Sequence, residues 1–189
     1  MISDTELARR AGVPVGIIAP IRTIESGGNP LAFRFECNKF NEDSTTRVPC
    51  TPAPGVRFSR TPSETNRAAF NRAYAINPRV AIESSSFGLY QQLGSTLLRL
   101  YSSPAAAIAA FDRDPSGVSA RLFEEYFQVR DGLRAAANRQ DWRALAEGYN
   151  GSDRWYERFM ELYSAPRSTG FVAMLIAAGV GYVAWRKWR

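Results

Sequence analysis

The stretch S-A-R-L-F-E-E-Y-F-Q-V-R-D-G-L-R-A-A, residues 119–136, carries the clearest structural pattern in the chain. Its apolar residues Leu122, Tyr126, Val129 and Leu133 recur at helical spacing, so they fall on one face of a helix. Charged residues occupy four of the eight positions between them. The pattern predicts an amphipathic helix through this stretch, with its apolar face turned toward a core.

Further helices are expected on both sides of this stretch. Each begins near a residue that can cap a helix, or ends at a glycine or proline. On the last of them, Trp155, Tyr156, Phe159, Leu162 and Tyr163 form a stripe, which indicates core packing. These helices are expected from Ser3 or Asp4 to Gly12, over residues 15–25, over 67–83 with a break at Asn77, over 142–147 after Asp141, and from Asp153 to Pro166.

One short strand is expected among these helices. In L-A-F-R-F-E, residues 31–36, Leu31, Phe33 and Phe35 alternate with other side chains, which is the period of a strand. Residues 37–66 contain many prolines, serines, threonines and asparagines and are interpreted as a long loop or hairpin. The predicted class is mainly α with a small β element (α+β).

Composition narrows the chemistry. The 189 residues are 45% hydrophobic and 22% charged, which suits a folded domain with a real core. Histidine is absent, and this excludes Ser-His-Asp and Cys-His nucleophiles and histidine-rich zinc sites. The net charge is +6, but basic residues are scattered among acidic ones, so a nucleic-acid partner is not expected. Carboxylates are therefore the expected carriers of any chemistry, with no metal ion or organic cofactor.

The C-terminal segment predicts a membrane span. Residues 168–185 are uncharged, and as a helix they would extend about 27 Å, close to the thickness of a hydrocarbon core. Aromatic residues gather at the end of this run, and the basic residues 186–189 follow. We therefore expect a folded domain over residues 1–166 and a transmembrane helix with a basic tail over 167–189. The protein would be anchored in a virion membrane or a host inner membrane. The basic tail favours the cytoplasmic side or the particle interior, with the domain facing the cell wall; a tail anchor with a cytoplasmic domain is the alternative.

Three short segments carry polar groups that core packing does not require. The first is I-E-S-G-G-N-P, in which Glu25 ends an apolar helix beside Ile21 and Ile24. Partial burial of a carboxyl group raises its pKa and keeps it protonated near neutral pH. A protonated carboxyl group is what a general acid needs to protonate a departing glycosidic oxygen.

The other two segments contain amide and aromatic side chains. S-S-S-F-G-L-Y-Q-Q-L-G, residues 84–94, joins a turn at Gly88 to Gln91, whose amide can donate to and accept from a sugar. A-E-G-Y-N-G, residues 146–151, ends a helix with an exposed aromatic, Tyr149, followed by Asn150. Taken alone, each of the three segments can also be explained as a helix end or a turn without a function in catalysis or binding.

In this order and spacing, the three segments resemble the N-acetylmuramidase domain of phage endolysins, within the wider lysozyme-like and lytic-transglycosylase group. The similarity covers roughly residues 5–165. It implies a lysozyme-like fold and cleavage of the β-1,4 bond between N-acetylmuramic acid and N-acetylglucosamine in peptidoglycan. It also implies site roles: Glu25 as the catalytic acid, Ser86, Gly88, Leu89 and Gln91 along the glycan groove, and Tyr149 and Asn150 beside the acid.

The mechanism stays open between two reactions. A hydrolase often needs a second carboxylate, and Glu36 is the nearest candidate. The alternative for Glu36 is an ion pair with Arg34 or Arg57. If no second carboxylate acts, Glu25 would serve as acid and then base, and the muramyl 6-hydroxyl would attack, as in a lytic transglycosylase.

Two other classes of function compete with an enzyme. One is a non-catalytic protein that binds peptidoglycan or assists virion assembly. The other is a membrane-disrupting protein that acts through its cationic tail. Besides glycan strands and the lipid bilayer, other virion or lysis proteins are candidate partners.

The two cysteines enclose a short loop. Cys37 and Cys50 bound 14 residues, and a disulfide there would stabilise the fold by around 3 kcal/mol in an oxidising compartment. The alternative is two free cysteines.

Overall fold

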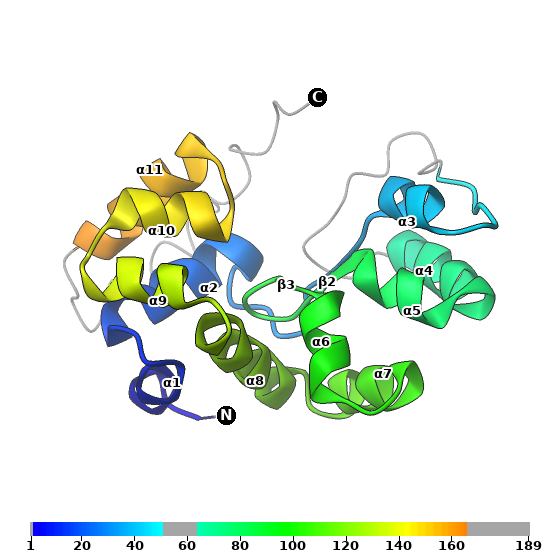
Figure 1. Cartoon of the computed structure of the whole chain (residues 1–189), viewed down its shortest axis with the longest axis horizontal. Helices are drawn as coiled ribbons and strands as arrows, with labels where there is room; N and C mark the ends of the chain where they lie inside the picture. Colours follow the sequence, from blue (N-terminus) through cyan, green and yellow to red (C-terminus); the bar gives the residue numbers. More distant parts are fainter. Residues whose placement is uncertain (1, 51–63, 166–189) are drawn as a thin grey trace.

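Two groups of helices lie on either side of a small antiparallel sheet (Figure 1). The computed structural model describes residues 2–50 and 64–165, and all structural statements below concern these residues. The predicted class, mainly helical with a small sheet, is confirmed. The first group of helices contains Glu25, and the second contains the disulfide.

The first group is built by short helices whose ends follow the predicted signals. Ser3 caps the first helix by accepting from the Glu6 backbone N–H at 3.2 Å, and Gly12 and Gly27 end two helices in the left-handed conformation. The last helix is capped by Ser152 and not by Asp153, because the Ser152 hydroxyl accepts the Trp155 backbone N–H. The elements are α1 (Asp4–Ala11), the 3-10 helix η1 (Val15–Ile17), α2 (Ile18–Ser26), α9 (Asp131–Asn138), α10 (Trp142–Tyr149) and α11 (Asp153–Ser164).

The sheet has three strands in the order β1-β2-β3, all antiparallel. Their bounds are β1 (Phe33–Phe35), β2 (Ser85–Phe87) and β3 (Gln92–Leu93). The predicted strand is therefore shorter than residues 31–36, and Leu31 is exposed. One face buries phenylalanines, whereas cross-strand pairing aligns Arg34, Ser86 and Leu93 in a row on the other face.

The second group of helices packs on the phenylalanine face of the sheet. Phe40 is fully buried here and lies 6.0 Å from Phe35 between ring centroids. The prediction of a loop over residues 37–66 is wrong where α3 lies, because burial of Phe40 favours a helix despite the polar composition. The elements are α3 (Cys37–Asp43), α4 (Glu64–Ile76), α5 (Pro78–Glu83), α6 (Gly94–Leu100) and α7 (Pro104–Arg113).

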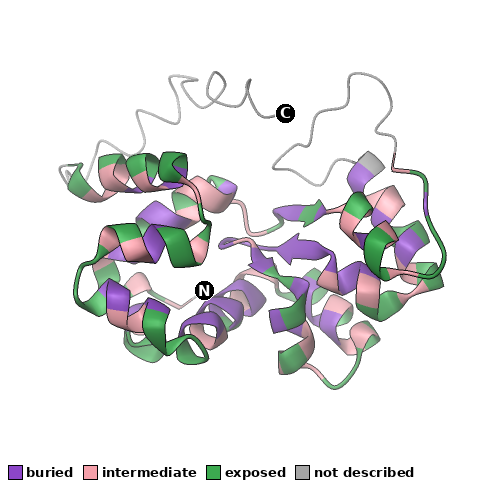
Figure 2. Ribbon diagram, turned by 45° about the horizontal axis from the view of Figure 1, so that its top comes forward, coloured by how far each residue is buried: buried purple, intermediate pink, exposed green. Residues whose placement is uncertain are grey.

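Helix α8 (Pro115–Gln128) joins the two cores. Its Val118 and Leu122 belong to the core of the second group, whereas Phe123 and Phe127 belong to the core of the first. Figure 2 shows burial concentrated along this central helix and the strands.

The predicted helix over residues 119–136 is in fact two helices. Helix α8 ends at Gln128, and the non-helical backbone of Arg130 separates it from α9. Val129, expected on the apolar face, is consequently 50% exposed. The apolar spacing survives the break because both helices pack on the same core through Tyr126 and Leu133.

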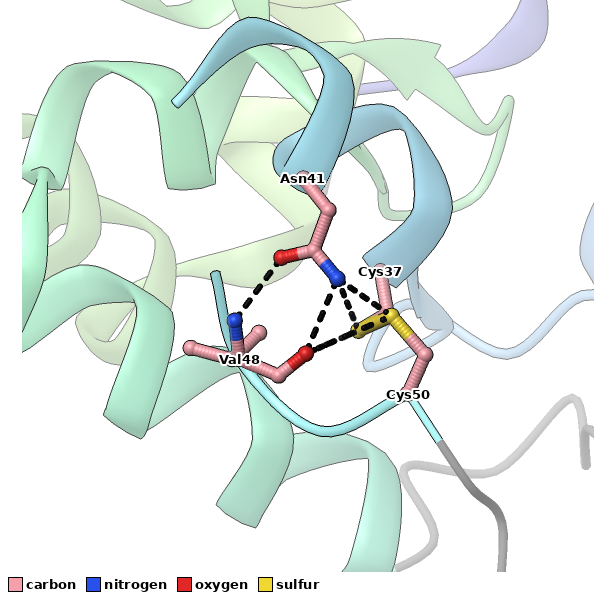
Figure 3. Close-up of a disulfide and its surroundings, with 4 residues drawn as sticks. All are labelled: Cys37, Asn41, Val48 and Cys50. Atoms are coloured by element: carbon pink, nitrogen blue, oxygen red, sulfur yellow. Dashed lines mark hydrogen bonds between the residues drawn. A yellow bond between two sulfur atoms is a disulfide. The ribbon is translucent and has the colours of Figure 1, made fainter. Parts of the chain in front are cut away.

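The disulfide ties the segment after α3 to the beginning of that helix (Figure 3). Cys37 and Cys50 form a disulfide and are not free cysteines. Asn41 fastens the same segment, since its side chain donates to the Val48 carbonyl at 2.9 Å and accepts from the Val48 N–H at 2.8 Å. The chain that follows Glu36 is therefore held by a covalent bond and a side-chain clamp.

Among the helices of residues 2–50 and 64–165, none is long and apolar enough to cross a bilayer. The span predicted over residues 168–185 lies outside the described residues.

Candidate active site

Glu25 lies in the last turn of α2, two residues before the cap at Gly27. Its side chain is half-buried and accepts a hydrogen bond from the indole nitrogen of Trp155, with 2.7 Å between Nε1 and Oε1. Trp155 comes from α11, which packs against α2 although the two residues are 130 positions apart. The carboxyl group is therefore partly buried, as expected, but it faces an aromatic wall of Trp155 and Tyr149 that its apolar neighbours in the sequence do not predict.

Trp155 itself is fixed on both faces of its ring. It is 4% exposed, and its centroid lies 5.3 Å from those of both Tyr149 and Phe159 in stacked arrangements. Stacking of this kind restricts the direction in which the indole N–H can point.

Tyr149 is the other part of this wall. Its hydroxyl accepts from Gln92 Nε2 at 2.6 Å and donates to the Tyr90 carbonyl oxygen at 3.0 Å. Burial, followed by the negative charge of Glu25, raises the pKa of Tyr149, so the hydroxyl stays protonated. The expectation of an exposed aromatic is wrong, because these two bonds and the stacking on Trp155 leave the side chain only half-exposed.

Tyr126 of α8 also interacts electrostatically with Glu25. Its ring lies edge-on to Tyr149, 5.3 Å between centroids. Burial raises the pKa of Tyr126, Arg130 opposes this shift, and Glu25 adds to it. Glu25 thus interacts with two neutral phenols from α8 and α10.

The turn after β2 requires its glycine. Gly88 has φ +73°, and a Cβ there would lie 1.9 Å from the Ser119 hydroxyl oxygen, which accepts the Leu89 backbone N–H. Gln91 is half-buried and has φ +47°; its side-chain amide donates to the Gly88 carbonyl oxygen at 3.0 Å. The Gln91 amide nitrogen therefore stabilises this turn.

The other two predicted groove residues lie in β2 and after α10. Ser86 of β2 stands between Arg34 and Leu93 in the cross-strand register and is buried, with 8% exposure. Asn150 is exposed after α10 and accepts from the Ser152 hydroxyl at 2.9 Å.

Glu36 has surroundings unlike those of Glu25. It forms an ion pair with Arg34 at 3.3 Å, and its side chain is 39% exposed. The ion-pair alternative is therefore present, with Arg34 as the partner. A role for Glu36 as the second carboxylate stays a prediction.

Sequence reasoning missed two contributors, Trp155 and Gln92. The aromatic stripe predicts that Trp155 packs in the core. This is correct for its ring, but the pattern does not indicate a partner for its indole N–H. Gln92 is 3% exposed and adjoins Gln91, whose amide was the one selected. Nothing in a single sequence distinguishes these two glutamines, because the choice depends on which one faces α10.

Residues 2–50 and 64–165 contain no group of three histidine, cysteine, aspartate or glutamate side chains able to hold a metal ion.

Helices around a small three-stranded sheet are consistent with a lysozyme-like fold. The fold is similar to the crystal structure of a Burkholderia AP3 phage endolysin, with a TM-score of 0.62 and 20% identity over 86% of this chain and 70% of that one.

The family follows from the sequence model for N-acetylmuramidases, which matches residues 19–163. The chain belongs to this family and is a glycosidase of the muramidase type, a class of enzyme that cleaves peptidoglycan. Comparison with curated protein sequences finds no significant match.

Proposed function

We propose that Glu25 is the general acid that cleaves the β-1,4 bond between N-acetylmuramic acid and N-acetylglucosamine. The observation that carries this proposal is the half-buried carboxyl group, which accepts from a neutral donor at 2.7 Å and interacts electrostatically with Tyr126 and Tyr149. Partial burial of a carboxyl group favours its protonated form. A carboxyl group that can stay protonated is able to donate to the leaving oxygen.

The reaction begins with the same step in both mechanisms. Glu25 gives its proton to the glycosidic oxygen as the bond to the muramyl anomeric carbon breaks. In hydrolysis, the hydroxyl of a water molecule joins that carbon, and the water's second proton restores Glu25. In transglycosylation, the muramyl 6-hydroxyl attacks the carbon and its proton restores Glu25, which leaves a 1,6-anhydro sugar.

We propose that the glycan contacts the Ser86 face of the sheet and the two turns. Ser86 would offer a hydroxyl in the row between Arg34 and Leu93. The turn of Gly88 and Gln91 would offer backbone and amide groups, and the exposed Asn150 a further amide. Tyr149 would contribute through its ring edge and through its contact with Trp155.

Substitution of the glutamate tests the catalytic proposal. Glu25→Gln should lower the rate of muropeptide release from purified peptidoglycan by about 10³-fold, the contribution typical of a general acid. Binding to sacculi should persist, because the side-chain shape is kept. The matched control is Glu147→Gln, at an exposed glutamate of α10, which should retain activity. Full activity in Glu25→Gln would refute the proposal, and absence of release by the unaltered protein would favour the non-catalytic alternative.

Product analysis separates hydrolysis from transglycosylation. Mass spectrometry of the released muropeptides should give reducing muramyl ends for a hydrolase. A product lighter by one water would identify a transglycosylase.

We further propose that residues 1–166 form the muralytic domain and that residues 167–189 anchor it in a membrane, with the enzyme facing the cell wall. The support is the uncharged run over 168–185 and the basic residues after it. The full chain should stay in the membrane pellet after carbonate extraction, whereas a variant with Leu175→Arg and Ile176→Arg should be released. Release of both proteins would refute the anchor and leave the glycosidase activity unaffected.

A further inference from the structure

We infer that Trp155 is a positioning residue for the reaction, an inference that rests on the proposed role of Glu25. Its indole N–H holds Oε1 of Glu25 at 2.7 Å and thereby fixes the direction of the carboxyl group that transfers the proton. Trp155 touches neither the glycan nor the reacting atoms in this role, and it acts only through Glu25.

The chemistry of the donor suits a catalytic acid. An indole nitrogen only donates, so it cannot take the proton from the carboxyl group. It is also neutral, unlike an arginine or lysine, which would strongly favour the ionised carboxylate. Trp155 can therefore orient Glu25 through both the protonated and the ionised stages of the reaction.

The indole is held rigidly enough to orient its partner. Phe159 stacks on it with an interplanar angle of 6°, and Tyr149 stacks with an angle of 24°. Tyr149 is in turn fixed through its hydroxyl by Gln92 and the Tyr90 carbonyl oxygen. The orientation of Glu25 thus depends on contacts that reach from α11 through α10 to the sheet.

Two titratable groups among the described residues interact with Glu25, and a charged group on the adjoining helix is paired elsewhere. Tyr126 and Tyr149 interact electrostatically with Glu25, and burial keeps both phenols neutral at working pH. Asp4 of the adjoining α1 is paired with Arg22 at 2.7 Å. A change in the pH profile that appears in Trp155→Phe but not in a variant elsewhere in the aromatic cluster would report on the bond to Glu25.

The test is Trp155→Phe in the full chain, which keeps an aromatic ring and removes the N–H. We expect kcat on purified peptidoglycan to fall about tenfold with KM within about twofold, since a single hydrogen bond to the acid is lost. Because the N–H stabilises the ionised carboxylate more than the acid, its removal should move the alkaline limb of the pH profile to higher pH.

Trp142→Phe is the matched control. Trp142 belongs to the same aromatic cluster, 5.5 Å from Phe159 and 4.6 Å from Tyr163 between centroids, and it does not bond Glu25. This variant should keep the kcat, KM and pH profile of the unaltered enzyme. Equal kcat and equal pH profiles for the two variants would overturn the inference.

A second measurement does not depend on activity or on the stability of a variant. In a proton–nitrogen NMR titration of the unaltered protein, the Trp155 indole N–H resonance should shift with the ionisation of Glu25. The titration should be absent in Glu25→Gln. An indole resonance that does not move with pH would overturn the inference even if Trp155→Phe failed to fold. An inactive Glu25→Gln alongside it would leave the proposed function standing.

Discussion

Glu25 and Glu36 lie only 11 positions apart in the chain, yet the fold gives them opposite surroundings. Glu25 is half-buried and accepts from the indole N–H of Trp155. Glu36 is more exposed and pairs with the guanidinium of Arg34 at 3.3 Å. The proposal that Glu25, and not Glu36, transfers the proton rests on this difference in burial and in hydrogen-bond donor.

The largest expected effect is the difference in activity between the variants Glu25→Gln and Glu36→Gln. Against the roughly 10³-fold loss expected for Glu25→Gln, Glu36→Gln should lose less than about tenfold in kcat, because an exposed ion pair contributes little. The measurement is muropeptide release from purified peptidoglycan at saturating substrate. A loss of 10²-fold or more in Glu36→Gln would instead identify Glu36 as the second carboxylate.

The second prediction concerns the bridge that begins one residue after Glu36. Replacing Cys37 and Cys50 together by serine should lower the free energy of unfolding by about 3 kcal/mol, the chain-entropy value for a loop of this length. Urea denaturation with and without a reducing agent measures this. The reductant should destabilise only the unaltered protein, and equal sensitivity in both would contradict the assignment.

The third prediction concerns the hydrogen bonds that hold Tyr149 beside Trp155 and Glu25. Tyr149→Phe removes a hydroxyl bonded to Gln92 and the Tyr90 carbonyl, so two polar groups lose a partner. We expect the free energy of unfolding to fall by about 1–3 kcal/mol. Thermal or urea unfolding gives the value, with Tyr156→Phe, on the neighbouring helix, as the control. Equal stability of Tyr149→Phe and the unaltered protein would show that the hydroxyl bonds contribute nothing.

The smallest expected effect is loss of the ion pair itself. Arg34→Ala should change the free energy of unfolding by less than about 1 kcal/mol, and added salt should reduce even that difference. Unfolding curves at low and high ionic strength test this expectation. A salt-independent loss of several kcal/mol would mean that the pair is not merely a surface contact.

Short-range signals predicted much of the fold. Ser3, Gly12, Gly27 and Asn77 mark helix ends where expected, because capping depends on backbone groups only a few residues away. The same signals failed at residues 37–43, where polar composition concealed a helix that packs through Phe40. They also missed β2 and β3, since strands this short show no period without their partners.

The sequence by itself determined that Glu25 ends an apolar helix, that Gly88 turns the chain, and that Cys37 and Cys50 can be joined. Each of these follows from local backbone geometry or from residue chemistry. Only the tertiary structure decided that Trp155 donates to Glu25 and that Arg34 pairs with Glu36. An aromatic stripe looks the same whether or not one indole N–H meets a carboxylate 130 positions away. That contact exists only because α11 packs on α2.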